Sequence, residues 1–131
     1  MSNLENIINE AWENKDQVDP NSDQSLKDAI NQVINDLDSG KSRVAEKING
    51  EWKTHQHLKK AIMLSFRVYE NDILSGPYSV WRDRQNLLKG KTAGWTKEEF
   101  EKAGFRMVPN SPVRKGSFVG KDAVLMPCYV N

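Results

Sequence analysis

Cysteine is almost absent from this sequence of 131 residues, which contains only Cys128. A single cysteine excludes an internal disulfide and any metal site built from several cysteines. An excess of one charge is also missing, because 19 lysines and arginines offset 18 aspartates and glutamates and leave a net charge of +1. This balance argues against a protein that binds nucleic acid or a membrane through bulk positive charge.

Long apolar runs are missing as well. The longest covers residues 61–66 and includes a serine, far short of the roughly 20 apolar residues that cross a bilayer as a helix. The first residues, 1–5, have neither the basic nor the apolar region of a secretion signal. We therefore expect a soluble cytoplasmic protein that has neither membrane nor nucleic acid as a partner.

The N-terminal third of the sequence has the periodicity of two amphipathic helices. Apolar residues recur at helical spacing over residues 4–12 and again over residues 26–37. Ser2 and Glu5 form a capping-box pattern before the first segment, and Gly40 follows the second segment where a C-cap glycine is expected. Two such helices joined by a short polar link should pack as an αα-hairpin.

The next segments change period twice. Residues 43–54 alternate with a period of two around Asn49-Gly50, a pair that favours a type I′ turn with positive φ at both residues, so a β-hairpin is predicted. Residues 57–69 return to a helical period. Residues 77–95, after the break at Gly76-Pro77, show no clear period and are predicted to form a long surface segment.

A second capping-box pattern, from Thr96 to Glu99, predicts a short helix that ends at Gly104. Residues 105–108 then have the character of an extended segment, which Pro109 stops.

From Val113 onward the sequence divides into three groups of six residues. The groups begin with Val113, Val119 and Leu125 and end with Phe118, Val124 and Val130. A period of six is typical of a hexapeptide β-helix, in which the first residue of each group points into a triangular coil. An ordinary pair of strands with a loop remains the alternative. A single coil exposes an unpaired strand edge, so we expect further coils or another chain to cover it.

Short segments along nearly the whole chain carry a resemblance. They are Leu4-Glu-Asn-Ile-Ile8, Asn31-Gln-Val-Ile34, Leu37-Asp-Ser-Gly40, Arg43-Val-Ala-Glu-Lys-Ile48, Trp52-Lys-Thr-His-Gln56, Leu58-Lys-Lys-Ala61, Leu64-Ser-Phe-Arg67, Gly104-Phe-Arg106, Val108-Pro109 and Leu125-Met-Pro127. In this order and spacing they resemble the bacterial tetrahydrodipicolinate N-succinyltransferases. Residues 76–95 match that family poorly.

The resemblance implies an α+β fold in two domains. Residues 1–110 would form a helical N-terminal domain with a small β-hairpin, and residues 111–131 the first coil of a left-handed parallel β-helix. It also implies a homotrimeric enzyme of the diaminopimelate route to lysine. That enzyme transfers a succinyl group directly from succinyl-CoA, its co-substrate, to the amine of ring-opened tetrahydrodipicolinate, and we expect no bound cofactor.

The family's acidic residues and its CoA groove would lie beyond residue 131. We therefore expect an incomplete and inactive N-terminal part with no catalytic residue of its own. Two other functions stay open: a non-catalytic binding or assembly module derived from this domain, and a different hexapeptide acyltransferase.

One substrate-binding residue follows from the resemblance. Arg106, in Gly104-Phe-Arg106, corresponds to the arginine with which the family contacts a carboxylate of the acyl acceptor. A guanidinium group suits this role because it offers a planar pair of N–H donors to a carboxylate. The alternative is a surface arginine paired with Glu98, Glu99 or Glu101.

The remaining candidates have plainer interpretations. Cys128 could accept an acyl group, but we expect a half-buried residue in a β-helix turn. His55 and His57 lack a third metal ligand, so we expect no metal site and a solvent-facing junction. The basic residues between 82 and 97 are expected in a solvated loop, and they are Arg82, Arg84, Lys89, Lys91 and Lys97. The four tryptophans are expected in or beside the core.

Overall fold

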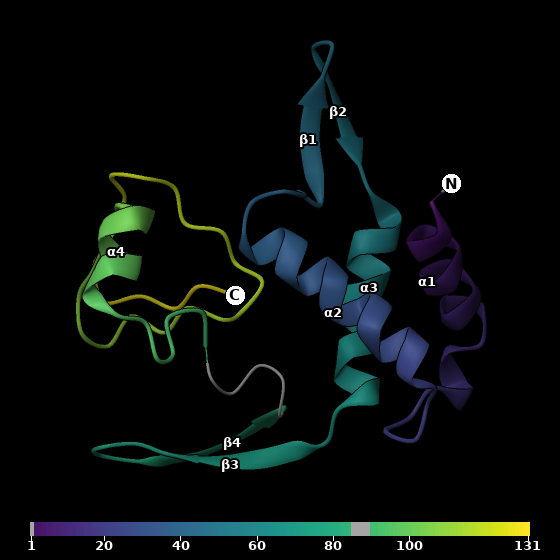
Figure 1. The fold of residues 1–131 in the computed structure, drawn as a ribbon, viewed down its shortest axis with the longest axis horizontal. Coiled ribbons are helices and arrows are strands. Elements are labelled where there is room, and N and C mark those ends of the chain that lie inside the picture. The colour runs from purple at the N-terminus through teal and green to yellow at the C-terminus, as the bar shows by residue number, and fades with distance from the viewer. Residues whose placement is uncertain (1, 85–89) are drawn as a thin grey trace.

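The computed structural model describes residues 2–84 and 90–131, in which three long helices are joined to a smaller C-terminal unit (Figure 1). The long helices are α1 (Asn3–Glu13), α2 (Gln24–Asp38) and α3 (Gln56–Val68), with a short 3-10 turn, η1 (Lys15–Gln17), after α1. All three helices confirm the periodicity of the sequence. Among the described residues, no helix is long and apolar enough to span a bilayer.

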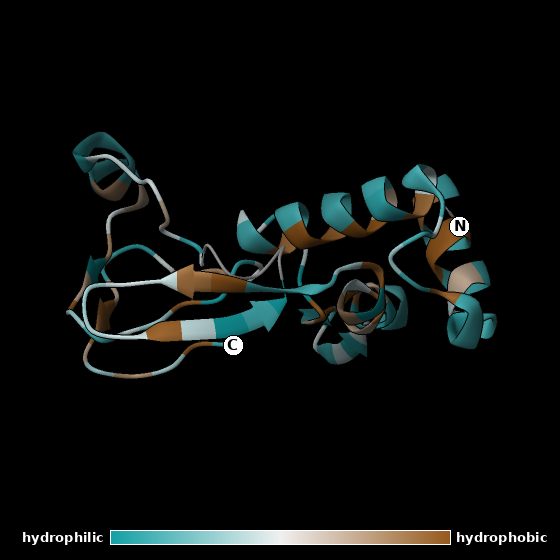
Figure 2. Ribbon diagram, turned by 90° about the horizontal axis from the view of Figure 1, so that it is seen from below, coloured by the Kyte–Doolittle hydropathy of each residue, from teal (hydrophilic) through white to brown (hydrophobic). Residues whose placement is uncertain are grey.

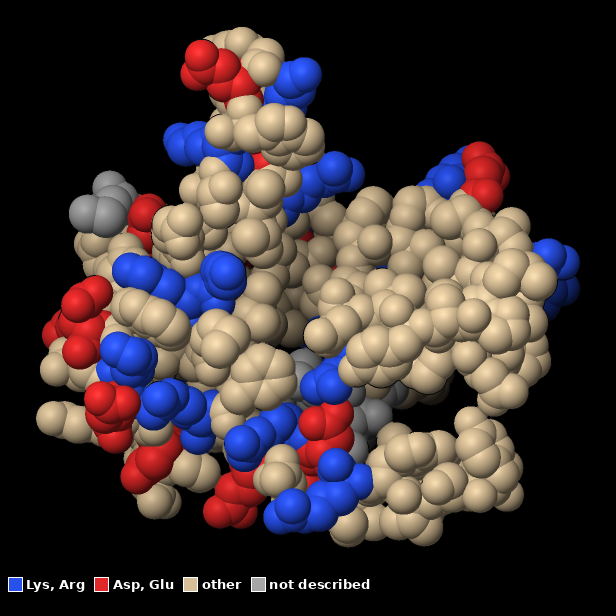
Figure 3. Space-filling view, turned by 180° about the vertical axis from the view of Figure 1, so that it is seen from behind, with Lys and Arg blue, Asp and Glu red and all other residues tan. Residues whose placement is uncertain are grey.

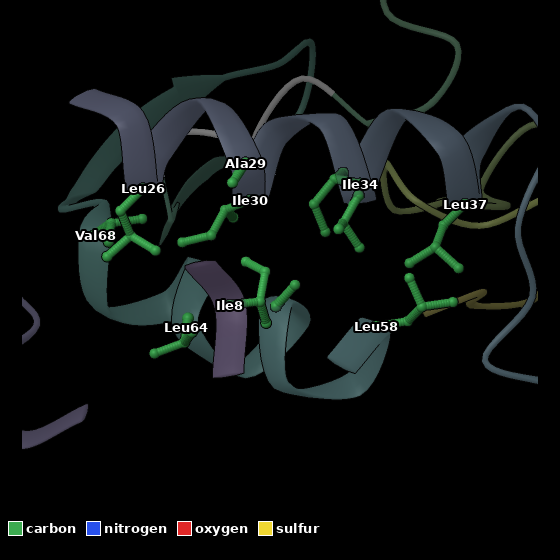
Figure 4. Close-up of a cluster of buried hydrophobic side chains, with 11 residues drawn as sticks. Ile8, Leu26, Ala29, Ile30, Ile34, Leu37, Leu58, Leu64 and Val68 are labelled. Atoms are coloured by element: carbon green, nitrogen blue, oxygen red, sulfur yellow. The ribbon is translucent and has the colours of Figure 1, made fainter. Parts of the chain in front are cut away.

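The three long helices share one apolar core. α2 turns its apolar side toward α1 and α3 and its polar side outward (Figure 2). The buried side chains meet between the helices (Figure 4), and they are Ile8, Leu26, Ala29, Ile30, Val33, Ile34, Leu37, Leu58, Ala61, Leu64 and Val68. The predicted packing of the first two helices is confirmed, and α3 completes the bundle.

One of the two hydrogen bonds of the predicted capping box begins α1. The Oγ atom of Ser2 accepts a hydrogen bond from the backbone N–H of Glu5 at 3.2 Å. The Glu5 carboxylate lies 3.5 Å from Nδ1 of His57, so it also links α1 to the start of α3.

The predicted hairpin is present as β1 (Ala45–Ile48) and β2 (Glu51–Thr54), which pair antiparallel and project away from the helices (Figure 1). Asn49 and Gly50 have φ values of 51° and 87°, as a type I′ turn requires. Trp52 is 74% exposed on this hairpin, so the expectation that every tryptophan packs in or beside the core is wrong for it.

A second hairpin corrects the sequence prediction for the segment after Gly76-Pro77. β3 (Asn71–Ser75) and β4 (Val80–Arg84) pair antiparallel, and the backbone N–H of Gly76 donates to Ser79 across the turn at 2.9 Å. The prediction failed because both faces of this hairpin carry apolar and charged residues, so no period of two stands out. The rest of the predicted surface segment includes Lys89, which lies outside the described residues.

The C-terminal unit begins with α4 (Lys97–Ala103), whose predicted capping box between Thr96 and Glu99 is confirmed in both directions. Gly104 ends the helix with a φ of 73°, in the left-handed region that favours glycine. The chain then enters β5 (Arg106–Met107), which pairs in parallel with β6 (Val124–Leu125).

The parallel pairing of β5 with β6 joins residues eighteen positions apart. Arg106 pairs with Val124, eighteen residues further along the chain, and Met107 pairs with Leu125. A separate parallel bridge joins Val113 to Val130, seventeen positions apart. Along β5 and β6 the chain therefore returns beside itself after eighteen residues, the length of three groups of six.

The first residues of the three groups of six share an interior. Val113 and Val119 are buried, and Leu125 packs partly buried against the same apolar cluster. Phe118 and Val124, at the ends of two groups, are each 50% exposed. The inward direction expected for the first positions is therefore confirmed.

Candidate substrate-binding site at Arg106

The backbone around Arg106 is held along one edge by the returning chain. Its N–H donates to the carbonyl of Ala123 at 2.9 Å. Two residues earlier, the carbonyl of Gly104 accepts a hydrogen bond from Asp122 at 2.7 Å. The reversal at Gly104 and these two bonds fix where the chain leaves α4.

The neighbouring side chain anchors this segment in the interior. Phe105 is buried and packs against the rings of Trp95 and Phe100, with centroids 5.8 and 5.9 Å away. Because side chains alternate along an extended strand, Arg106 points out of the cluster, and its side chain is exposed. Met107 turns inward again, against the same cluster.

The acidic residues that could have neutralised Arg106 have other roles. Within residues 2–84 and 90–131, no ion pair joins Arg106 to Glu98, Glu99 or Glu101. The Glu99 carboxylate accepts the backbone N–H of Thr96 at 2.6 Å, and Glu101 lies 3.5 Å from Nζ of Lys97. The guanidinium of Arg106 is thus available to a carboxylate from outside this segment.

Glu98 lies in the first turn of α4, and the pKa of its carboxyl is lowered. A hydrogen bond from its own backbone amide, and then one from the Thr96 hydroxyl, lower the pKa of its carboxyl from the ordinary value. The carboxylate therefore belongs to the cap of α4.

Sequence reasoning missed the residues that join the two parts of the chain. The side chain of Lys91 is only 6% exposed, and its Nζ lies 3.1 Å from Oδ2 of Asp38 and 2.7 Å from the Asp38 carbonyl. The other carboxylate oxygen, Oδ1, accepts the backbone N–H of Gly116 at 2.8 Å. The expectation of a solvated lysine at position 91 is therefore wrong.

The position of Asp38 itself could have signalled this contact. An aspartate at the last residue of a helix faces the negative end of the helix dipole, which disfavours it unless another group compensates. Lys91 and the Gly116 amide supply that compensation.

A second link connects the hairpin β3–β4 to the C-terminal unit. Nη1 of Arg114 lies 2.9 Å from Oδ2 of Asp83 and donates to the Tyr129 hydroxyl at 3.0 Å. On the same hairpin, Arg84 donates to the Tyr69 carbonyl at 3.0 Å. Neither arginine was predicted to have a structural role.

The two histidines lie apart from Arg106, in the helical part of the chain. Nε2 of His55 lies 2.6 Å from Glu46, and Nδ1 of His57 lies 3.5 Å from Glu5. Both side chains are largely covered, so the expectation of a solvent-facing junction is wrong. Among the described residues, no group of three or more histidine, cysteine, aspartate or glutamate side chains is arranged to hold a metal ion.

Cys128 is exposed, and the expectation of a half-buried residue is corrected. Trp81 is 39% exposed on β4, which adds a second tryptophan outside the core.

Comparison with known proteins identifies the family of this chain. A family model described as "Tetrahydrodipicolinate N-succinyltransferase N-terminal" matches residues 3–68, from the start of α1 to the end of α3. The chain belongs to the tetrahydrodipicolinate N-succinyltransferase family. This confirms the family that the sequence resemblance indicated.

Individual relatives match over a longer stretch. A protein of Pelagibacter ubique (strain HTCC1062) named 2,3,4,5-tetrahydropyridine-2,6-dicarboxylate N-succinyltransferase is 66% identical over 131 residues, which is 100% of this chain and 48% of that protein. Proteins of the same name from Dechloromonas aromatica (strain RCB) and Actinobacillus succinogenes are 51% and 50% identical, over 98% and 100% of this chain and 46% and 47% of theirs. The chain thus spans about half the length of the curated relatives it matches.

Proposed function

We propose that this chain is the N-terminal part of a cytoplasmic enzyme that transfers the succinyl group of succinyl-CoA to the amine of ring-opened tetrahydrodipicolinate, on the diaminopimelate route to lysine. The observation that carries the proposal is the 66% identity, over all 131 residues, with a relative named as an N-succinyltransferase of this dicarboxylate. Arg106 is exposed and forms no ion pair within the described ranges 2–84 and 90–131, so it adds a group suited to a dicarboxylate acceptor.

The reaction is an acyl transfer from a thioester to an amine. The nitrogen lone pair attacks the thioester carbonyl carbon, the C–N bond forms, and the C–S bond breaks. The proton lost by the amine goes with the departing CoA sulfur, which leaves as the thiol. Direct transfer needs no acyl-enzyme and assigns no step to Cys128, which is exposed.

Arg106 acts in this scheme as a binding residue. Two of its guanidinium N–H donors would hold one carboxylate of the acceptor through paired hydrogen bonds. The backbone bond to Ala123 and the burial of Phe105 support this role, because they fix the strand while the side chain remains free.

The proposal includes the remainder of the fold. The parallel pairing of Arg106 with Val124, one hexapeptide coil apart, supports residues 111–131 as the first coil of a left-handed β-helix after a domain of residues 1–110. Further coils would cover the edge of β6 and would carry the catalytic groups and the CoA groove. We propose a homotrimer with its active sites between neighbouring β-helices.

The test is an assay of CoA thiol release by the full-length protein with tetrahydrodipicolinate and either succinyl-CoA or acetyl-CoA. We expect release that depends on both substrates and is faster with succinyl-CoA. Release by residues 1–131 alone would contradict the proposed location of the catalytic groups. A preference for acetyl-CoA or another acceptor would indicate a different hexapeptide acyltransferase, and no release from any acyl-CoA would indicate a non-catalytic module.

A further inference from the structure

The hairpin β3–β4 is an exposed element with unusually apolar sides. Every residue from 70 to 82 is exposed. Large apolar side chains are nevertheless concentrated there: Ile73, Leu74, Tyr78, Val80 and Trp81 are 37–74% exposed. A two-stranded sheet without cover is marginal in water, and apolar residues on both sides indicate that other surfaces contact it.

The register of the hairpin assigns these side chains to two faces. Ile73 lies opposite Arg82, and Val80 lies opposite Ser75, so one face presents Ile73 and Val80 beside the cationic Arg82. This surface is called the basic face below.

The other face has the opposite charge. Leu74 lies opposite Trp81, and Asp72 lies opposite Asp83, so this face presents an apolar pair beside two carboxylates. Asp83 is already bound to Arg114, whereas the Asp72 carboxylate accepts only the N–H of the adjacent Ile73 at 2.8 Å among the hydrogen bonds described. This surface is called the acidic face below.

The two faces are complementary to each other and not to themselves. Contact between two basic faces brings Arg82 against Arg82, and contact between two acidic faces brings carboxylate against carboxylate. Contact of a basic face with an acidic face joins opposite charges over apolar pairs of similar kind. Such a contact uses different surfaces of the two partners, and repeated by rotation it closes into a ring.

We infer that the occupant of the hairpin is a second copy of this chain, with the basic face of one β3–β4 hairpin against the acidic face of the next. This inference deepens the proposed homotrimer and rests on it for the presence of neighbouring copies. The hairpin projects below the C-terminal unit (Figure 1), and in the view from behind it forms a lobe whose charged groups gather toward its base (Figure 3). The C-terminal unit of the same chain holds only Asp83, through Arg114, and the turn residue Tyr78, whose hydroxyl donates to Asn110 at 3.1 Å. The apolar side chains of both faces stay exposed.

Charge reversal in the full-length protein tests the arrangement. Arg82→Glu alone and Asp72→Arg alone each place like charges across the contact, so each should raise the dissociation constant of the assembly, measured by sedimentation equilibrium on dilution, about tenfold. The double variant Arg82→Glu/Asp72→Arg restores opposite charges and should return to about the wild-type value. Lys53→Glu, the same charge change on an exposed strand of the other hairpin, is the control and should have no effect.

The outcomes separate the possible occupants. Equal dissociation constants for all variants would show that another segment of the same chain covers the hairpin, or that nothing does. A double variant weaker than either single one would indicate contact between like faces. Either result overturns the inference.

A second measurement does not depend on charge. A photo-crosslinking residue in place of Val80, in a mixture of 14N- and 15N-labelled protein, should join peptides of residues 71–84 from different copies. Crosslinks only within one isotope would contradict the inference. Succinyl transfer is assayed separately, so an inactive protein with an intact ring would refute the proposed function alone.

Discussion

Lys91 and Asp38 form a largely buried ion pair, 3.1 Å from Nζ to Oδ2, between the end of α2 and the chain that leads into the C-terminal unit. Because the Asp38 carboxylate also accepts the Gly116 amide, one side chain fixes two separate segments against the helix. The ring of Phe118 lies against Gly40, which follows Asp38 by two residues. The helical part therefore sets the position of the C-terminal unit, which includes Arg106.

The first prediction concerns this pair. Lys91→Met leaves the Asp38 carboxylate with a buried charge that only the Gly116 amide compensates, so we expect a loss of about 2–4 kcal/mol in the free energy of unfolding. Chemical denaturation of the full-length protein measures the loss. Hydrogen exchange should also show faster exchange of the Gly116 amide. Unchanged protection at Gly116 would show that the pair does not hold the joint.

The second prediction separates strain from contact at Gly40. Its φ is +76°, and an added Cβ would lie 2.7 Å from the Phe118 ring. Gly40→Ala should therefore cost about 1 kcal/mol for the left-handed backbone and at least as much again for the displaced ring. Gly50→Ala is a matched control, because Gly50 has a φ of +87° and nothing within 4 Å.

The contact part of this cost can be isolated. Adding Phe118→Ala to Gly40→Ala removes the ring, so the double variant should lose less stability than the two single losses added together. Simple additivity, or equal losses for Gly40→Ala and Gly50→Ala, would contradict the contact.

The third prediction concerns the pH dependence of α4. The pKa of Glu98 in the folded state lies below the ordinary value of 4.5. The stabilisation is therefore present above pH 4.5 and is lost as the pH falls through the lower folded-state value. An NMR titration of the Glu98 side chain should give a midpoint below 4.5, and Thr96→Val should shift it upward. A midpoint at or above 4.5 in the unmodified protein would refute the role of the cap.

The elements that could be predicted from the sequence are those with a local signature. The stripes of α1, α2 and α3, the turn at Asn49-Gly50 and the capping box at Thr96 each lie within a few residues of sequence. The hairpin β3–β4 could not be predicted, because exposure of both faces removes the alternation between buried and exposed positions.

The contact between the helical part and the C-terminal unit, and the site at Arg106, have no local signature in the sequence. The pairing of Lys91 with Asp38 joins residues 53 positions apart, and a single sequence contains no signal for which lysine an aspartate will meet. Arg106 was found through the family resemblance alone. The domain boundary at residue 110 and the role of Arg106 stay predictions.

The fourth prediction tests the central claim, that Arg106 holds a carboxylate of the acyl acceptor. In the full-length protein, Arg106→Ala should weaken acceptor binding, measured by calorimetry, by about tenfold to a hundredfold, since it removes charge-assisted hydrogen bonds. The acceptor affinity of the Arg106→Lys protein should lie between those of the wild type and the Arg106→Ala protein, because an ammonium keeps the charge without the planar pair of donors. Arg43→Ala, at an exposed arginine of the helical part, is the control.

The most direct measurement compares the two substrates on the Arg106→Ala protein. If Arg106 holds the acceptor, the dissociation constant for tetrahydrodipicolinate should rise by at least about tenfold, while that for succinyl-CoA should change less than about twofold. Unchanged acceptor affinity, with assembly of the subunits lost instead, would show that Arg106 is a structural residue and not a substrate-binding one.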